Sequence, residues 1–248
     1  MLERCRRVLQ SVREVQATVT PDGALAGELK IGVAHALTEI TLTEPLDLLR
    51  KKFSKVELRL TTGWSRGLLE QVRSGALDAA VILLPEEDAL PAAVRGVEIG
   101  KEQLVVVAPK QKSNGRQRLA QLQGVSWILN PEGCAARAGL QRALQRANVD
   151  MRVALETYNY ELQLSLVARN RGWSLVPSRI LQGSRLRSRL HVVQVNGLHF
   201  PLRIWSVTGE AELRLSPVIE ELNRELKKRF LRTRAFSAKP RSRQIPPV

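Results

Sequence analysis

The chain of 248 residues is 44% hydrophobic, which is enough for one large domain or two small ones, and its formal net charge is +15. It contains no long uncharged apolar run and no signal-peptide pattern, which argues against a membrane span, a membrane partner and export. Its two cysteines are too few for a disulfide framework and favour the reducing cytoplasm as its location.

The first 22 residues predict an amphipathic helix with an apolar stripe along one side. Apolar side chains recur at alternating steps of three and four, which is the spacing of a coiled-coil seam. Because an exposed apolar stripe needs a partner, we expect this helix to pair with a second copy of the chain, as a homodimer or homotetramer. Pro21, Asp22 and Gly23 then end the helix. The predicted dimerisation residues are Leu2, Cys5, Leu9, Val12 and Val19.

From residue 28 the sequence alternates strand-like and helix-like segments, an order typical of an α/β protein with a mainly parallel sheet. Strands are predicted over residues 28–34, 56–60, 77–84, 103–109, 125–129, 152–156, 172–177, 190–195 and 202–207. Helices are predicted between the first two strands and over residues 66–74, 134–146, 159–170 and 217–229. The number of such units favours two small lobes over one long sheet.

The chain ends in a basic segment. Nine basic residues and a single acidic one, Glu225, lie between Arg224 and the C-terminus, so more than half of the excess charge lies in the last helix and the tail. The prolines and serines of residues 231–248 predict a disordered tail. A solvated terminus is the simpler interpretation, and nonspecific contact with nucleic-acid phosphates is the alternative.

Three predicted strand-to-helix turns are candidates for a binding site. Ligands of open α/β sheets bind beyond the carboxyl ends of the strands, and a helix start offers free N–H groups to an anion. The candidate effector-binding residues are His35, Ala36, Leu37, Thr38, Trp64, Ser65, Asn130, Glu132, Gly133 and Cys134. Arg66 and Arg137, each just inside a helix start, are further candidates because guanidinium suits carboxylate and phosphate. Plain helix capping is the alternative explanation for each loop residue.

The segment GWSRG at residues 63–67 also fits the G-x-S-x-G nucleophile elbow of serine hydrolases. Ser65 would be the nucleophile, with His191 or His199 as the base. The elbow follows only the second predicted strand, and no His-Gly oxyanion segment precedes it, so we prefer Ser65 as the cap of the next helix and expect no enzyme activity. No Cys/His spacing predicts a metal site, and no nucleotide fingerprint predicts a cofactor.

Several short motifs follow the heptad helix in a specific order. The strand G-x-L-x-I-G covers Gly27–Gly32, a helix ends in G-x-L-D at Gly75–Asp78, and a later helix ends in V-A-x-x-x-G at Val167–Gly172 before a strand closed by Pro177. Each motif alone is short, but their order and spacing are specific. Over roughly residues 1–230 the chain resembles the linker helix and effector-binding region of LysR-type transcriptional regulators.

The resemblance implies a two-lobed, type II periplasmic-binding-protein-like fold with an N-terminal dimerising helix. Residues 27–102 and 206–230 would form subdomain I and residues 103–205 subdomain II, with crossovers near Gln103 and Trp205. A small, anionic metabolite would bind between the lobes and change the dimer geometry to control transcription. The family carries a winged helix-turn-helix before the linker helix, so promoter DNA is expected as a partner only through that domain, which this sequence lacks. A solute-binding protein for transport, or a hydrolase using Ser65, is the alternative.

Overall fold

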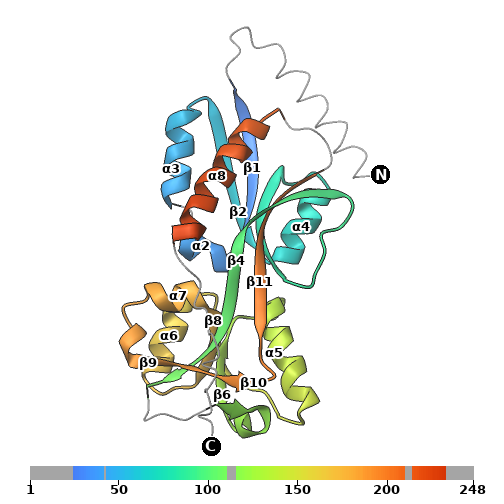
Figure 1. Ribbon diagram of the computed structural model, residues 1–248. Coiled ribbons are helices and arrows are strands. Elements are labelled where there is room, and N and C mark those ends of the chain that lie inside the picture. The colour runs from blue at the N-terminus through green and yellow to red at the C-terminus, as the bar shows by residue number, and fades with distance from the viewer. Residues whose placement is uncertain (1–24, 42, 111–115, 210–213, 233–248) are drawn as a thin grey trace, which may run out of the picture.

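Figure 1 shows the computed structural model of the chain, which we describe for residues 25–41, 43–110, 116–209 and 214–232. The predicted dimerising helix over residues 1–22 and the chain after residue 232 lie outside these ranges. Within them, no helix is long and apolar enough to cross a membrane. The described residues form two lobes, and two long strands run from one lobe into the other.

Lobe I is built around three parallel strands. β1 (Gly27–Ala34) lies between β2 (Val56–Gly63) and β3 (Ala79–Pro85) and pairs in parallel with both. Parallel neighbours need crossover connections, and here these are helical: α2 (His35–Thr41) and α3 (Thr43–Lys52) follow β1, and α4 (Ser65–Arg73) follows β2. Figure 1 shows α3 and the last helix, α8 (Ser216–Arg232), on one side of these strands and α4 on the other. Because both faces are covered, the central strands read as apolar runs, such as AAVILL in β3.

Two elements differ in extent from the sequence prediction. The single helix expected after the first strand is divided into α2 and α3, and Pro45 lies in the first turn of α3, where a missing N–H costs nothing. The last helix continues through Arg232, so the first two residues of the predicted disordered tail are helical.

The two long strands that join the lobes are β4 (Val94–Pro109) and β11 (Phe200–Gly209), and they pair antiparallel. In lobe I, β3 pairs with β11 from Leu202 onward, and in lobe II, β8 (Trp173–Pro177) pairs with β4 from Leu104 onward. Among the described strands, only β4 and β11 are therefore paired at the row that joins Gln103 to Pro201. We call this row the waist.

The predicted second crossover near Trp205 is displaced. Ile204 is fully buried in the core of lobe I, and Trp205 packs against the same core. Both residues also pair with β3, through Leu83 and Ile82. The chain therefore enters lobe I at Pro201, four residues before the predicted position.

Lobe II extends the same sheet from the other edge of β4. β8 is followed by β6 (Ser126–Leu129) and β7 (Arg152–Glu156), while β9 (Leu190–Val193) pairs with the end of β4. The helices of this lobe are α5 (Ala135–Arg146), α6 (Tyr160–Ala168) and α7 (Ser178–Gly183), and a small two-stranded sheet joins β5 (Gln117–Arg118) to β10 (Val195–Asn196). Two apolar clusters fill the lobe, one around Trp127, Leu140 and Leu144 and the other around Val107, Leu164 and Val176.

A buried ion pair lies beside the waist. The side chain of Glu102 is 0% exposed and that of Arg179 is 5% exposed, and a guanidinium nitrogen lies 3.4 Å from Oε2 of Glu102. The backbone N–H of Gln103 and the hydroxyl of Ser178 each donate to Oε1 of the same carboxylate, at 2.7 Å. Arg179 also donates to the carbonyl oxygen of Phe230 at 3.1 Å. The pair thus connects α7 of lobe II to β4 and to the last turns of α8 in lobe I.

Replacing Arg179 with Met should lower the free energy of unfolding by about 3 to 5 kcal/mol, because Glu102 would stay buried without its counter-charge. The control Arg73→Met breaks the exposed ion pair with Glu70 and should cost less than about 1 kcal/mol. Urea unfolding followed by circular dichroism measures both losses. Equal, small losses would show that the buried pair does not stabilise the junction of the lobes.

Gly172, the last residue of the V-A-x-x-x-G motif, should not tolerate a side chain. Its φ is 152°, and a Cβ would lie 2.6 Å from the carbonyl oxygen of Ser126. We therefore expect Gly172→Ala to cost more than about 2 kcal/mol of stability in the same assay. The control Gly183→Ala, whose Cβ would meet nothing within 4 Å, should leave stability within about 1 kcal/mol of the parent. Equal free energies of unfolding for the two variants would contradict the close contact between Gly172 and β6.

Candidate functional site

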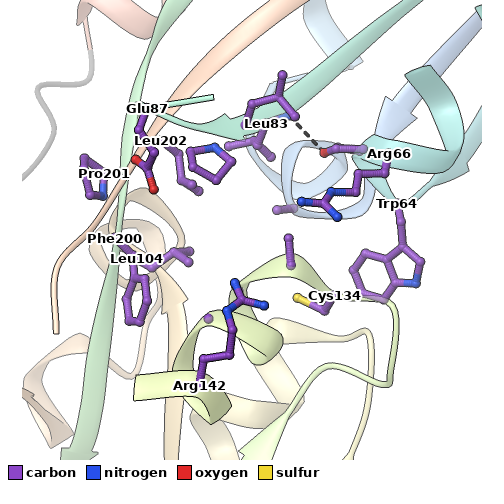
Figure 2. A pocket seen from close by; sticks show the side chains of 18 of the residues that line it. Trp64, Arg66, Leu83, Glu87, Leu104, Cys134, Arg142, Phe200, Pro201 and Leu202 are labelled. Carbon is purple, nitrogen blue, oxygen red and sulfur yellow. Dashed lines mark hydrogen bonds between the residues drawn. The ribbon is translucent and has the colours of Figure 1, made fainter. Parts of the chain in front are cut away.

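A cavity of about 410 Å³ lies between the two lobes beside the waist. Lobe I contributes the residues that follow β1 and β2 and the end of β3, and lobe II contributes the start and one face of α5. Parts of β4 and β11 complete the wall, as Figure 2 shows for Leu104, Phe200, Pro201 and Leu202. The volume is in the range of cavities that enclose small molecules.

Most of the predicted strand-to-helix residues meet at this cavity. Because β1 and β2 are parallel, their carboxyl ends lie at the same edge of the sheet, and the turn before α5 faces them from lobe II. The predicted residues that line the cavity are His35, Ala36, Trp64, Ser65, Arg66, Gly133 and Cys134.

The other predicted residues do not line it. Leu37 is 0% exposed in the core of lobe I, and the hydroxyl of Thr38 donates to the carbonyl oxygen of His35 at 2.7 Å within α2. The side chain of Glu132 is 90% exposed, pairing loosely with Arg137. These residues lie in the turns beside the cavity, but their side chains lie in the core, within α2 or in solvent.

Asn130 lies behind the cavity, in a buried hydrogen-bond network. Its amide donates to the hydroxyl of Tyr160 at 2.8 Å and to the sulfur of Cys134 at 3.8 Å. The side-chain amide of Gln163 donates to Oδ1 of Asn130 at 2.6 Å, and the hydroxyl of Ser174 donates to Oε1 of Gln163 at 2.7 Å. Tyr160 and Cys134 do line the cavity, so Asn130 positions two lining residues rather than lining the cavity itself.

Arg137, the other predicted arginine, does not line the cavity. Its guanidinium donates to Glu156 at 2.7 Å and to the carbonyl oxygen of Asn130 at 3.3 Å, and its side chain is 11% exposed. It therefore ties α5 to β7. Arg142 and Arg146, farther along the same helix, line the cavity instead.

Sequence reasoning missed these two arginines, although a signal for them exists. The face of α5 that lines the cavity carries small residues at helical spacing, namely Ala135, Ala136, Gly139 and Ala143. A face of small residues leaves room beside a helix, and long side chains on that face can reach into the space. The pattern could have marked Arg142 and Arg146 before the structure was known.

Ser65 is not the cap of α4, contrary to the sequence interpretation. Trp64 occupies the N-cap position, and the hydroxyl of Ser65 accepts a hydrogen bond from the backbone N–H of Leu83 at 3.0 Å, drawn as a dashed line in Figure 2. This bond holds the start of α4 to β3. Among the described residues, no hydrogen bond joins the Ser65 hydroxyl to a histidine. The starts of α4 and α5 both lack a side-chain cap, since the N-cap residues Trp64 and Cys134 accept no such bond.

Three rings meet across the two lobes, and two of them, His35 and Trp64, line the cavity. His35 and Trp64 of lobe I have ring centroids 5.0 Å apart, and Tyr158 of lobe II lies 4.8 Å from His35 and 5.5 Å from Trp64. Gly133 approaches the same indole so closely that a Cβ would lie 2.7 Å from its Nε1. Aromatic pairs at such distances contribute about 0.5–1.5 kcal/mol each beyond their burial, so this cluster holds the lobes together.

The cavity has a surplus of positive charge. Arg66, Arg142 and Arg146 line it, and none of them forms a hydrogen bond or ion pair with the described residues. Glu87 is the one carboxylate among the lining residues. Within the described part of the chain, no group of three or more side chains is placed to hold a metal ion.

Burial lowers the pKa of His35, because a charged imidazole would lose solvation beside Trp64 and Tyr158. The folded state thus favours the neutral imidazole of His35. The stability that this ring contributes is complete above pH 6.5, the ordinary pKa of histidine, and is lost as the pH falls below that value, because the unfolded chain then binds a proton more readily. We expect the free energy of unfolding to decline from pH 8 to pH 5, and the variant His35→Phe to decline less steeply. Urea titrations at each pH measure the two slopes, and identical slopes would contradict a role for His35.

Known proteins resemble this chain in sequence and in fold. The LysR substrate binding domain matches residues 22–231. The malonate utilization transcriptional regulator of Klebsiella pneumoniae is 27% identical over 184 residues, which are 73% of this chain and 60% of that protein. An OxyR mutant of Corynebacterium glutamicum has a TM-score of 0.64 at 19% identity, covering 92% of this chain and 72% of that chain. The CcmR regulatory domain of Synechocystis PCC6803, in complex with 2-PG, has a TM-score of 0.66 at 18% identity. The match covers 81% of this chain and 96% of that chain.

These matches establish the fold and the family. The solved structures share the two-lobed, type II periplasmic-binding-protein-like α/β fold that the sequence predicted. This chain spans 60% of the length of the malonate utilization regulator, which is less than two thirds of that protein. The family match covers residues 22–231, and the chain therefore belongs to the LysR substrate binding domain family.

Proposed function

We propose that this chain is the effector-sensing domain of a LysR-type transcriptional regulator and that a small, anionic metabolite binds in the cavity between its lobes. The observation that carries the proposal is the charge of this cavity, where three arginines without a bonded partner in the described residues meet two helix starts without side-chain caps. Guanidinium groups and free backbone N–H groups both bind carboxylate and phosphate. A negatively charged molecule would therefore supply the counter-charge and the hydrogen-bond acceptors that these groups lack.

The similar proteins support a small ligand for a domain of this fold. One relative is named for malonate utilization, and one structural neighbour is described in complex with 2-PG. In this chain the proposed contacts are side chains of His35, Trp64 and Arg66 from lobe I and the start of α5, including Cys134, from lobe II. Ser65 and Asn130 act by holding these elements in position.

A ligand that touches both lobes can change their arrangement. It does so only as far as it binds one arrangement more tightly than another. The narrow waist permits such movement, since only β4 and β11 are paired there among the described strands. We propose that the change passes, in a cytoplasmic homodimer, through the helix predicted from the sequence over residues 1–22 to a DNA-binding domain of a longer protein.

A thermal-shift screen of the chain against neutral, cationic and anionic metabolites tests this function. An anionic ligand at a hundredfold excess over its Kd adds about 2.7 kcal/mol of stability, which raises the melting temperature of a protein of this size by about 5 to 10 °C. We expect such shifts from anionic compounds alone.

Two variants locate the binding. Ala135→Trp places an indole at an exposed position that lines the cavity, and it should abolish the shift. Ala92→Trp adds the same bulk at an exposed position outside the cavity and should keep it. A screen without any stabilising compound, or a shift that survives Ala135→Trp, would refute the proposed function.

A further inference from the structure

Two arginines face each other across the cavity from opposite lobes. Figure 2 shows the guanidinium groups of Arg66 and Arg142 directed into the space between the lobes, with the sulfur of Cys134 nearby. Arg66 comes from the first turn of α4 in lobe I, and Arg142 from the middle of α5 in lobe II. Neither forms a hydrogen bond or ion pair with a described residue, whereas the neighbouring Arg137 is fully engaged with Glu156 and the Asn130 carbonyl.

We infer that the molecule bound here carries two anionic groups, one held by Arg66 and the other by Arg142. This inference rests on the proposed function and narrows it to a class of ligand, namely small dicarboxylates and phosphorylated carboxylates. Planar guanidinium groups bind carboxylate and phosphate through paired hydrogen bonds, so each arginine can take one end of such a molecule.

Electrostatics explains why two negative groups are needed. In the empty cavity the two exposed guanidinium groups carry like charges, and water screens their repulsion without removing it. A single anionic group can pair with one arginine and leaves the other without a counter-charge. A molecule charged at both ends neutralises both arginines, and it binds best when the lobes bring them to its length. Recognition and the change in lobe arrangement thus depend on the same two contacts.

The other charges around the cavity agree with this assignment. Arg146 lines the cavity one helical turn after Arg142 and also lacks a bonded partner in the described residues. Figure 2 shows Glu87 beside Pro201 and Leu202, on the opposite side of the cavity from Trp64. The carboxylate of Glu87 therefore lies away from the space between Arg66 and Arg142 and does not cancel the positive charge there.

Isothermal titration calorimetry with pairs of probes of equal chain length tests the inference. The pairs are malonate with propionate, succinate with butyrate, glutarate with pentanoate, and 2-phosphoglycolate with glycolate. We expect a doubly charged probe to bind at least about tenfold more tightly than its singly charged partner, because it makes a second charge-assisted contact. Dimethyl malonate, the uncharged diester of malonate, should not bind.

Arg66→Gln and Arg142→Gln should each lower the affinity for the doubly charged probe by about 10- to 100-fold. The affinity should then equal that for the singly charged partner. The control Arg95→Gln removes one positive charge from an exposed position of β4 outside the cavity, and it should change the affinity by less than about threefold. Circular dichroism verifies that all three variants fold.

The outcomes separate this inference from the proposed function. A singly charged anion from the metabolite screen that binds the parent, Arg66→Gln and Arg142→Gln equally well overturns the inference and leaves the function standing. Loss of binding in only one of the two variants also overturns it, since a bridging ligand needs both arginines. If no compound binds the parent, both the function and the inference fail.

Discussion

The pairing of β4 with β11 is the constraint on which both lobes depend. Each strand belongs to the sheet of lobe I and to the wall of the cavity, and β4 continues into the sheet of lobe II. The buried pair of Glu102 and Arg179 lies where the lobe I and lobe II parts of the sheet meet. The carboxylate accepts a hydrogen bond from Ser178 of α7, and the guanidinium donates one to Phe230 in the last turns of α8. This junction therefore limits the arrangements that the lobes can take around the cavity.

The cavity combines a rigid side with a charged, open side. The rings of His35, Trp64 and Tyr158 join the lobes at one edge, and the hydrogen bonds of Asn130 and Gln163 stiffen the wall behind the start of α5. Exposed arginines occupy the remaining space, where water and ligand can compete for them. The arginines form no bond with the described residues, so they can vary without unfolding the domain.

Much of the fold could be predicted from the sequence, because apolar periodicity and glycine positions determine where strands and helices alternate. The turns that line the cavity were also predictable, since the carboxyl ends of parallel strands must meet at one edge. The choice of arginine was missed, although the small residues on one face of α5 carried a signal for it. Arg137 and Arg142 lie on the same helix, and only the packing of α5 on lobe II decides which one meets Glu156 and which one faces the cavity. Ser65 was misread as a cap because its bond to Leu83 joins distant segments.

The waist also determines what kind of movement costs least. A two-stranded ribbon carries more twist than a wide sheet, and the register shift between Ile204 and Trp205 adds local twist close to the narrow row. Sliding the lobes apart would break the ladder of β4 and β11, whereas turning one lobe about the ribbon axis changes its hydrogen bonds little. Rotation of one lobe about the ribbon axis therefore disturbs fewer hydrogen bonds of β4 and β11 than separation of the lobes.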